Sequence, residues 1–207
     1  GAYIAIPEIA GYVPPTKTVK NLEIVNIDGV DFQFFTDYDV DANDCLLVWL
    51  PKQKVILNNL LWGAMPNIYS LRGSNYRDPE TIMKGLNKVR ELKPEFLLNT
   101  VAVPQSGEKV CREHVENTAD FFMLVKDQTM RAMLLGNAPQ DLGRFVKMPK
   151  HLRELDYLSE TYGVMETFPE SIYQFSRGWF DGDAANIFKL PRKTEADNLI
   201  KAIGGAD

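Results

Sequence analysis

The sequence is poor in the residues that most often hold transition metals. It contains two histidines, His114 and His151, and two cysteines, Cys45 and Cys111. A catalytic zinc site takes about three or four protein ligands, mostly histidine with acidic residues or cysteine. No His-x-His-x-Asp-His or His-Glu-x-x-His pattern is present, and the cysteines are far apart. We therefore expect no metal ligand set in this chain, and two free thiols.

The sequence also lacks long apolar runs and an excess of positive charge. No run of about 18 apolar residues occurs, so we expect no membrane-spanning helix. Lysine and arginine number 23 against 28 acidic residues, a net charge of -5. That balance argues against a nucleic-acid partner, which usually requires a basic surface. With 45% hydrophobic and 25% charged residues over a length of 207, the chain is expected to be a soluble globular protein of one or two domains.

Four strand signals occupy the first quarter of the chain. Leu22–Ile27 and Val30–Thr36 flank Asp28–Gly29, a dipeptide that suits a tight hairpin because glycine tolerates positive φ. Cys45–Leu50 and Val55–Leu57 form a second pair around a proline and lysine break. Their continuous apolar residues predict strands that are covered on both faces, as in a sheet between layers of helices.

A helix and another strand follow. Asp78 is a good N-cap, Pro79 fits the first helical position, and Lys93–Pro94 ends the apolar periodicity. Glu95–Val103 is predicted to be a buried strand. The order of two strand pairs, helix and strand indicates half of an α/β sandwich rather than a whole one.

The rest of the chain, from about residue 108, is predicted to be all-helical. Apolar residues recur there close to the helical period, and prolines and glycines separate the segments. The predicted helices are Val110–Leu135, a short helix between Pro139 and Pro149, Lys150–Tyr162 ended by Gly163, and Glu170–Phe180.

Two polar groupings are weaker candidates for a site. Cys111 and His114, three residues apart, share a face of a predicted helix, but no third group to orient the imidazole is visible, so we favour helix packing over a thiolate–imidazole pair. An acidic stretch before Cys45 could offer oxygen ligands to calcium, but it lacks the glycine and the closing glutamate of a calcium loop. We favour a solvated loop for its carboxylates, which are Asp37, Asp39, Asp41 and Asp44.

The segment from Pro66 to Asp78 is the most informative. Arg72 and Arg77 flank a glycine just before the predicted helix. Guanidinium groups bind tetrahedral oxyanions through paired hydrogen bonds, and a helix N-terminus favours negative charge. We predict that Arg72 and Arg77, with Tyr69, form an anion-binding site at the cleft; the alternative is a pair of internal salt bridges.

This segment resembles the Asn-Leu-Tyr-Thr-Leu-Arg-Gly segment of the alkylsulfatases of the metallo-β-lactamase fold. Lys126–Arg131, Lys-Asp-Gln-Thr-Met-Arg, is similar to the family's His-Asp-Gln-Thr-Leu-Arg. Tyr173–Asn186 resembles the family's Tyr-Gln-x-Tyr-Leu-Gly-Trp-Phe-Asp-Gly-Asn-Pro-Ala-Asn, a long string of high specificity. Together the resemblance covers most of residues 14–207.

The resemblance implies an α/β fold with three parts. Residues 1–107 would be the second half of a metallo-β-lactamase-like αββα sandwich, residues 108–192 an all-α dimerisation domain, and residues 193–207 a linker or the start of a further domain. Because a zinc-binding domain precedes dimerisation in the family, both ends of the chain are expected to be internal. The expected partners are a second copy, in a homodimer, and a separate chain or segment carrying the N-terminal half of the fold.

The resemblance also shows departures. The family's zinc ligands, two glutamates and a histidine, fall on residues that include amides and aliphatic side chains, which cannot replace them. Arg72, in contrast, matches the family's sulfate-contacting arginine, and Arg77 a neighbouring anion-contacting position. The residues that match the family's zinc ligands are Asp41 for the first glutamate, Asn58 or Asn59 for the second glutamate, and Val101 or Ala102 for the histidine.

We therefore interpret the chain as a portion of an alkylsulfatase-like protein, of the sulfuric ester hydrolase family, that has no zinc or other cofactor of its own. It would serve as an assembly subunit or bind an anionic amphiphile such as an alkyl sulfate. The alternative is an active metal-dependent alkyl sulfate ester hydrolase whose ligands come from a missing N-terminal segment or a partner chain.

Overall fold

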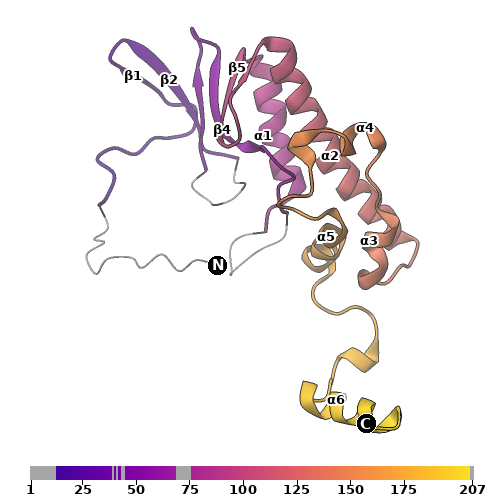
Figure 1. Ribbon diagram of the computed structural model, residues 1–207. Helices are drawn as coiled ribbons and strands as arrows, with labels where there is room; N and C mark the ends of the chain where they lie inside the picture. Colours follow the sequence, from indigo (N-terminus) through magenta and orange to yellow (C-terminus); the bar gives the residue numbers. More distant parts are fainter. Residues whose placement is uncertain (1–12, 39, 41, 43–44, 69–75, 206–207) are drawn as a thin grey trace.

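A six-stranded sheet forms the first part of the molecule (Figure 1). The computed structural model describes residues 13–38, 40, 42, 45–68 and 76–205. Neighbouring strands are antiparallel except β4 and β5, which are parallel because a helix crosses between them. In sheet order the strands are β1 (Ile24–Ile27), β2 (Val30–Phe35), β3 (Leu47–Leu50), β4 (Val55–Trp62), β5 (Phe96–Val101) and β6 (Gln105–Ser106).

The predicted hairpin between β1 and β2 is confirmed. Asp28 and Gly29 both have positive φ, 50° and 84°. Two such residues make the turn whose twist matches that of the flanking strands. The turn sets Ile27 opposite Val30 and fixes the register of the whole pair.

The crossover helix α1 (Pro79–Leu92) begins and ends where the sequence predicts. The Asp78 carboxylate accepts a hydrogen bond from the Glu80 amide, 3.1 Å, and Lys93 ends the helix in the left-handed conformation before Pro94. The apolar face of α1 is buried against the sheet, where Gly85 lies against Leu60 of β4.

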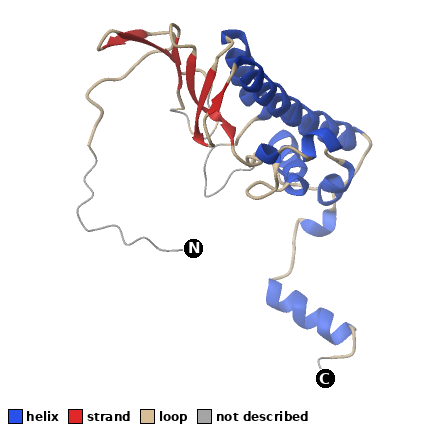
Figure 2. Cartoon of the chain, turned by 45° about the horizontal axis from the view of Figure 1, so that its top comes forward, coloured by secondary structure: helices blue, strands red, loops and turns tan. Residues whose placement is uncertain are grey.

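The long helix α2 (Glu108–Leu134) connects the sheet to the remaining helices. It packs beside α1 and the sheet at its start and against two later helices further along (Figure 2). One hydrophobic core runs without a break from Phe35 in β2 to Ile172. The domain boundary near residue 108 therefore stays a prediction, since α2, which starts there, contributes to both sides. The other helices are α3 (Leu142–Phe145), α4 (Lys150–Arg153), α5 (Phe168–Arg177) and α6 (Arg192–Ala202).

One face of the sheet is covered and the other is not, within the part of the chain that the structure describes. Ile56 and Leu97 point to the helices and are fully buried, whereas Leu57 and Leu98, on the opposite face, are each 38% exposed. The prediction of strands buried on both faces, including the buried strand at 95–103, was wrong for this second face. The residues of the second face are as apolar as those of the first face. A sequence pattern shows that a strand is apolar on both faces, but it does not show whether both faces are covered.

The helix predicted over 150–162 was also wrong. α4 ends at Arg153, and a single 3-10 turn follows at Asp156–Leu158. Leucines 152, 155 and 158 recur every three residues, a spacing that suits 3-10 turns better than an α-helix. Gly163 does not end a helix: its amide donates to the Met65 carbonyl at 2.8 Å, and a Cβ there would lie 2.7 Å from that oxygen.

The last part of the chain extends away from the core (Figures 1 and 2). α6 has no buried residue. We call residues 178–203 the arm; many of its apolar side chains are exposed. No helix among the described residues is both long and apolar enough to cross a membrane. The exposed apolar residues of the arm are Trp179, Phe180, Ile187, Phe188, Leu190, Leu199, Ile200 and Ile203.

Gly163→Ala should destabilise the fold. The added methyl would meet backbone oxygens of residues 65 and 66 that cannot move independently, so we expect a loss of about 2 kcal/mol or more in the free energy of unfolding. Urea denaturation measures it. Thr161→Ala, an exposed change in the same turn, is the control and should shift stability by less than about 0.5 kcal/mol. Equal stability of both variants would contradict the close approach.

Candidate functional site

Four side chains meet where the parallel strands β4 and β5 end and the helical part begins. Such a place, outside the carboxyl ends of parallel strands, is where open α/β sheets usually bind ligands. Trp62 stacks on Tyr162 with ring centroids 5.3 Å apart, and the Arg77 guanidinium lies 5.5 Å from the centre of the Trp62 ring. Asn67 forms hydrogen bonds with both Tyr162 and Arg77. We call Trp62, Asn67, Arg77 and Tyr162 the Arg77 cluster.

Asn67 holds the Arg77 cluster together from the inside. It is almost fully buried, and its amide group donates to the Tyr162 hydroxyl at 3.0 Å. Its side-chain and backbone oxygens accept hydrogen bonds from Arg77, the latter at 3.3 Å. The guanidinium is therefore fixed in place by an amide and an indole, so its position is set before any ligand arrives.

Tyr76 anchors the same segment to the helical part. Its ring stacks on Phe175 of α5, with centroids 3.8 Å apart and an angle of 15° between the planes. Burial, and then the neighbouring charge of Asp78, raise the pKa of the Tyr76 hydroxyl well above its usual value, so it stays neutral at physiological pH. Tyr76 thus ties the segment that precedes α1 to α5.

The structure reports on one of the three predicted anion-binding residues. Arg77 lies at the end of the sheet, with its guanidinium in the Arg77 cluster. Arg72 and Tyr69 lie outside the described residues. The approach of the two arginines to a shared anion therefore stays a prediction.

The residues at the family's zinc positions point in different directions. Asn58 faces the helices and is 3% exposed; its oxygen accepts from the amides of Leu60 and Leu61, at 3.1 and 3.0 Å, where β4 bulges. Its amide group donates to the Asn99 side chain at 2.7 Å. Asn59 lies on the opposite face, its amide 3.7 Å from the sulfur of Cys45. The two residues that could match the family's second glutamate, Asn58 and Asn59, therefore lie on opposite faces of the sheet.

Neither face offers a metal site within the described residues. No group of three or more histidine, cysteine, aspartate or glutamate side chains gathers in that part of the chain. Val101, one of the two residues that match the family's histidine, is an exposed aliphatic side chain. Of the acidic stretch, Asp37 is described and accepts a hydrogen bond from Asn21; Asp39, Asp41 and Asp44 lie outside the described residues. Among the described residues, the amide of Asn59 and the aliphatic side chain of Val101 are not zinc ligands.

His114 is a packing histidine, as favoured from the sequence. It is 3% exposed and stacks on Tyr157 at 3.9 Å, whose hydroxyl accepts a hydrogen bond from Asn117 at 2.9 Å. Neither ring nitrogen makes a hydrogen bond of normal geometry in the described structure. Burial lowers the pKa of His114 to about 4, and the nearby Trp62 backbone opposes this only in part.

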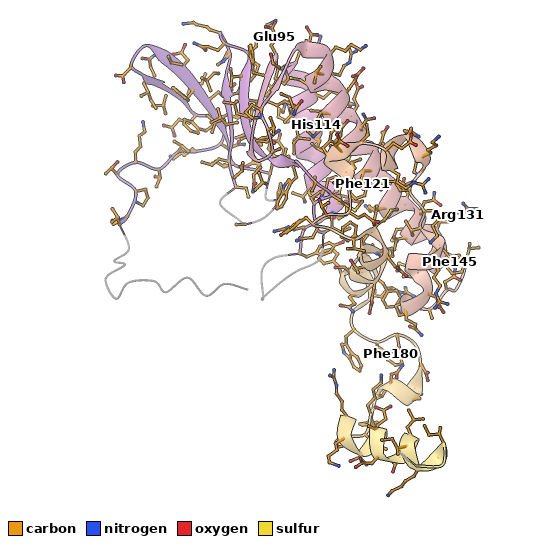
Figure 3. The ribbon with its side chains drawn as sticks, viewed as in Figure 1. Glu95, His114, Phe121, Arg131, Phe145 and Phe180 are labelled. Carbon is orange, nitrogen blue, oxygen red and sulfur yellow. The ribbon has the colours of Figure 1, made fainter. Side chains whose placement is uncertain are left out.

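The alternative Cys111–His114 pair does not form. The Cys111 thiol donates instead to the Glu95 carbonyl, 3.4 Å away, and burial raises its pKa. Both cysteines are free thiols, as predicted. His114, Phe121 and Arg131 follow one another along α2 in Figure 3, so the buried imidazole lies at the sheet end of the helix.

The chain is similar to known proteins over nearly its whole length. Residues 138–207 match the family model described as alkyl sulfatase dimerisation. A linear primary-alkylsulfatase of Pseudomonas sp. (strain ATCC 19151) is 32% identical over 199 residues, 95% of this chain and 38% of the relative. The alkyl/aryl-sulfatase BDS1 of Saccharomyces cerevisiae is 28% identical over 94% of this chain and 31% of the relative.

The fold has a solved counterpart. The stereoselective inverting sec-alkylsulfatase Pisa1 from Pseudomonas sp. superimposes with a TM-score of 0.85 and 24% identity, over 94% of this chain and 32% of that one. The predicted fold class, a mixed α/β sheet followed by helices, is confirmed. The chain spans about a third of the length of the relatives that it matches.

His114 should make stability depend on pH. Its pKa is about 4 in the folded state and 6.5 when unperturbed, so between these values the unfolded chain binds more protons and stability falls as the pH is lowered. We expect protonation of His114 in the unfolded chain to lower the free energy of unfolding by roughly 2–3 kcal/mol between pH 7 and pH 4. Denaturation of wild type and His114→Phe across pH 4–7 measures it: the variant should lose this part of the slope.

The second histidine provides the matched control for this measurement. His151 is exposed, so His151→Gln should keep the wild-type slope. A slope that is the same in wild type and His114→Phe would show that His114 is protonated, or accessible to protons, in the folded state.

Proposed function

Because this chain is alkylsulfatase-like and includes the alkyl sulfatase dimerisation region, we propose that its function is assembly. It joins two copies of the protein through the arm, and its open sheet face receives a second sheet that completes the sandwich. An anionic amphiphile, such as an alkyl sulfate, would bind at the Arg77 cluster. The single observation that carries the assembly function is the arm, with its many exposed apolar side chains and no buried residue in α6.

The arm needs a partner for physical reasons. Phe188 is 91% and Trp179 73% exposed, and exposed apolar surface gathered in one segment marks an interaction site. α6 has 11 residues, and an isolated helix of that length is marginal in water. Packing against a second copy would supply what the helix lacks. The arm lies inside the matched dimerisation region, residues 138–207.

The open sheet face is the second unpartnered surface. The strand register places Phe34, Val48, Leu57 and Leu98 side by side across β2 to β5, which makes a continuous apolar row. A second sheet packed about 10 Å away would bury such a row from water. We propose that a separate chain or another segment, carrying the N-terminal half of the fold, supplies that sheet.

Zinc chemistry does not enter this proposal. Asn58 is committed to hydrogen bonds within the sheet, and Asn59 and Val101 offer no anionic or imidazole group. An active hydrolase would need its ligands from residues outside those described here. The role of this chain in the proposal is to position the anionic head group through Arg77, and none of its described residues is given a catalytic role.

Sedimentation velocity at tens of micromolar tests the assembly function. Wild type should sediment as a dimer. Phe188→Lys places a charge in the apolar arm and should raise the dimer dissociation constant by at least about tenfold, since buried aromatic anchors dominate interfaces. Gln53→Lys adds the same charge at an exposed turn beside the sheet and should change nothing. A folded wild-type monomer at this concentration, or a Phe188→Lys variant that dimerises normally, would contradict the proposal.

A further inference from the structure

A pocket of about 200 Å³ lies where the C-terminal end of α1 meets the start of α2. These helices lie side by side in Figure 1. The pocket is at the opposite end of α1 from Arg77, roughly 20 Å away for a helix of this length. Its floor is apolar and buried, and its rim is charged and exposed. The floor consists of Val89, Pro94, Cys111 and Val115, and the rim of Arg90, Lys93, Glu108 and Arg112.

Two of the acidic residues that flank the basic rim residues in the sequence are already paired with other lysines. Glu91 forms an ion pair with Lys88 at 2.5 Å, and Glu95 with Lys54 at 2.7 Å. No ion pair or side-chain hydrogen bond of Arg90 or Lys93 is found within the described part of the chain.

The third cation of the rim is also weakly held. Among the described residues, the ion pair found for Arg112 is with Glu116, at 4.0 Å. Three cations therefore surround the opening against one rim carboxylate, Glu108, in a chain whose net charge is negative.

Helix electrostatics explain part of this arrangement but not all of it. Basic residues at the end of α1 complement the negative end of its dipole, which accounts for Arg90 and Lys93. Arg112 lies near the start of α2, where the dipole does not favour a cation. Its convergence with the other two over an apolar floor has no such explanation.

The floor suits a short apolar chain. A cavity of about 150 Å³ lined by aliphatic side chains accepts benzene, so a pocket of this size has room for a chain of about six to eight carbons. The Cys111 thiol is kept neutral by burial and is bonded to the Glu95 carbonyl. The Cys111 side chain is fully buried, so it adds an uncharged, apolar group behind the floor.

We propose that this pocket binds a medium-chain carboxylate. The carboxylate group lies between Arg90, Lys93 and Arg112, where guanidinium forks can hold both of its oxygens. The hydrocarbon chain lies on the floor beside Cys111. This site goes beyond the assembly function and shares no residue with the Arg77 cluster, so either can fail without the other.

Calorimetric titration of the full chain with octanoate tests the site. We expect one octanoate to bind per chain, with acetate and octanol each at least about tenfold weaker because each lacks one half of the recognition. Arg90→Gln/Lys93→Gln should weaken octanoate by at least about tenfold. Lys84→Gln/Lys109→Gln makes the same charge change at exposed positions of the same two helices and should leave binding unchanged. Absence of octanoate binding would overturn the proposal.

A second readout locates the ligand. Octanoate should slow the modification of Cys111 by methyl methanethiosulfonate, followed by mass spectrometry of the Cys111 peptide, while the Cys45 peptide reports general reactivity. Octanoate could instead adsorb to the open sheet face or the arm. Binding that is undiminished in Arg90→Gln/Lys93→Gln, or that leaves the Cys111 rate unchanged, would assign it there and refute the pocket.

Discussion

The packing of α2 against two different partners is the constraint on which the rest of the structure depends. The helix has 27 residues and is therefore about 40 Å long. Val115 lines a pocket together with Val89 of α1, whereas Phe121 packs edge-to-face on Phe168 of α5. Because one rigid helix packs on both parts, the end of the sheet and the short helices are held at a fixed distance. The Arg77 cluster exists because Tyr162, from the helical part, is thereby brought onto Trp62.

This arrangement leaves apolar surface that the described part of the chain does not cover. The helices hide one face of the sheet, and the short helices cover the second half of α2. The row through Leu57 on the open sheet face and the arm around Phe188 remain in contact with solvent. These two apolar surfaces of the described chain, one on the sheet and one in the arm, are the reason for proposing that it is part of a larger assembly.

Local signals predicted much of the fold from the sequence. The Asp28–Gly29 turn, the Asp78 cap of α1 and the long apolar periodicity of α2 each act within a few residues, and all three were confirmed. The helix at 150–162 failed because its leucines follow a three-residue spacing. The open sheet face was missed because an apolar strand does not reveal whether its covering layer belongs to the same chain.

The candidate site was harder to predict. Arg77 was found because it adjoins a helix start within a motif. Trp62, Asn67 and Tyr162 were missed, since Tyr162 lies 95 residues from its hydrogen-bond partner Asn67 and nothing in the spacing joins them. The resemblance to the family left open whether Asn58 or Asn59 matches the second glutamate, although strand alternation puts the two residues on opposite faces. The hydrogen bonds of Asn58 with Asn99 and with the amides of Leu60 and Leu61 show that Asn58 is the structural residue of the two.

Hydrogen–deuterium exchange of the arm as a function of protein concentration tests the central claim most directly. If a second copy packs on the arm, the backbone amides of α6 should be protected at tens of micromolar and lose protection on dilution, while those of α2 exchange equally slowly throughout. Amides of α6 that exchange rapidly at every concentration, or are protected independently of concentration, would contradict assembly through this segment.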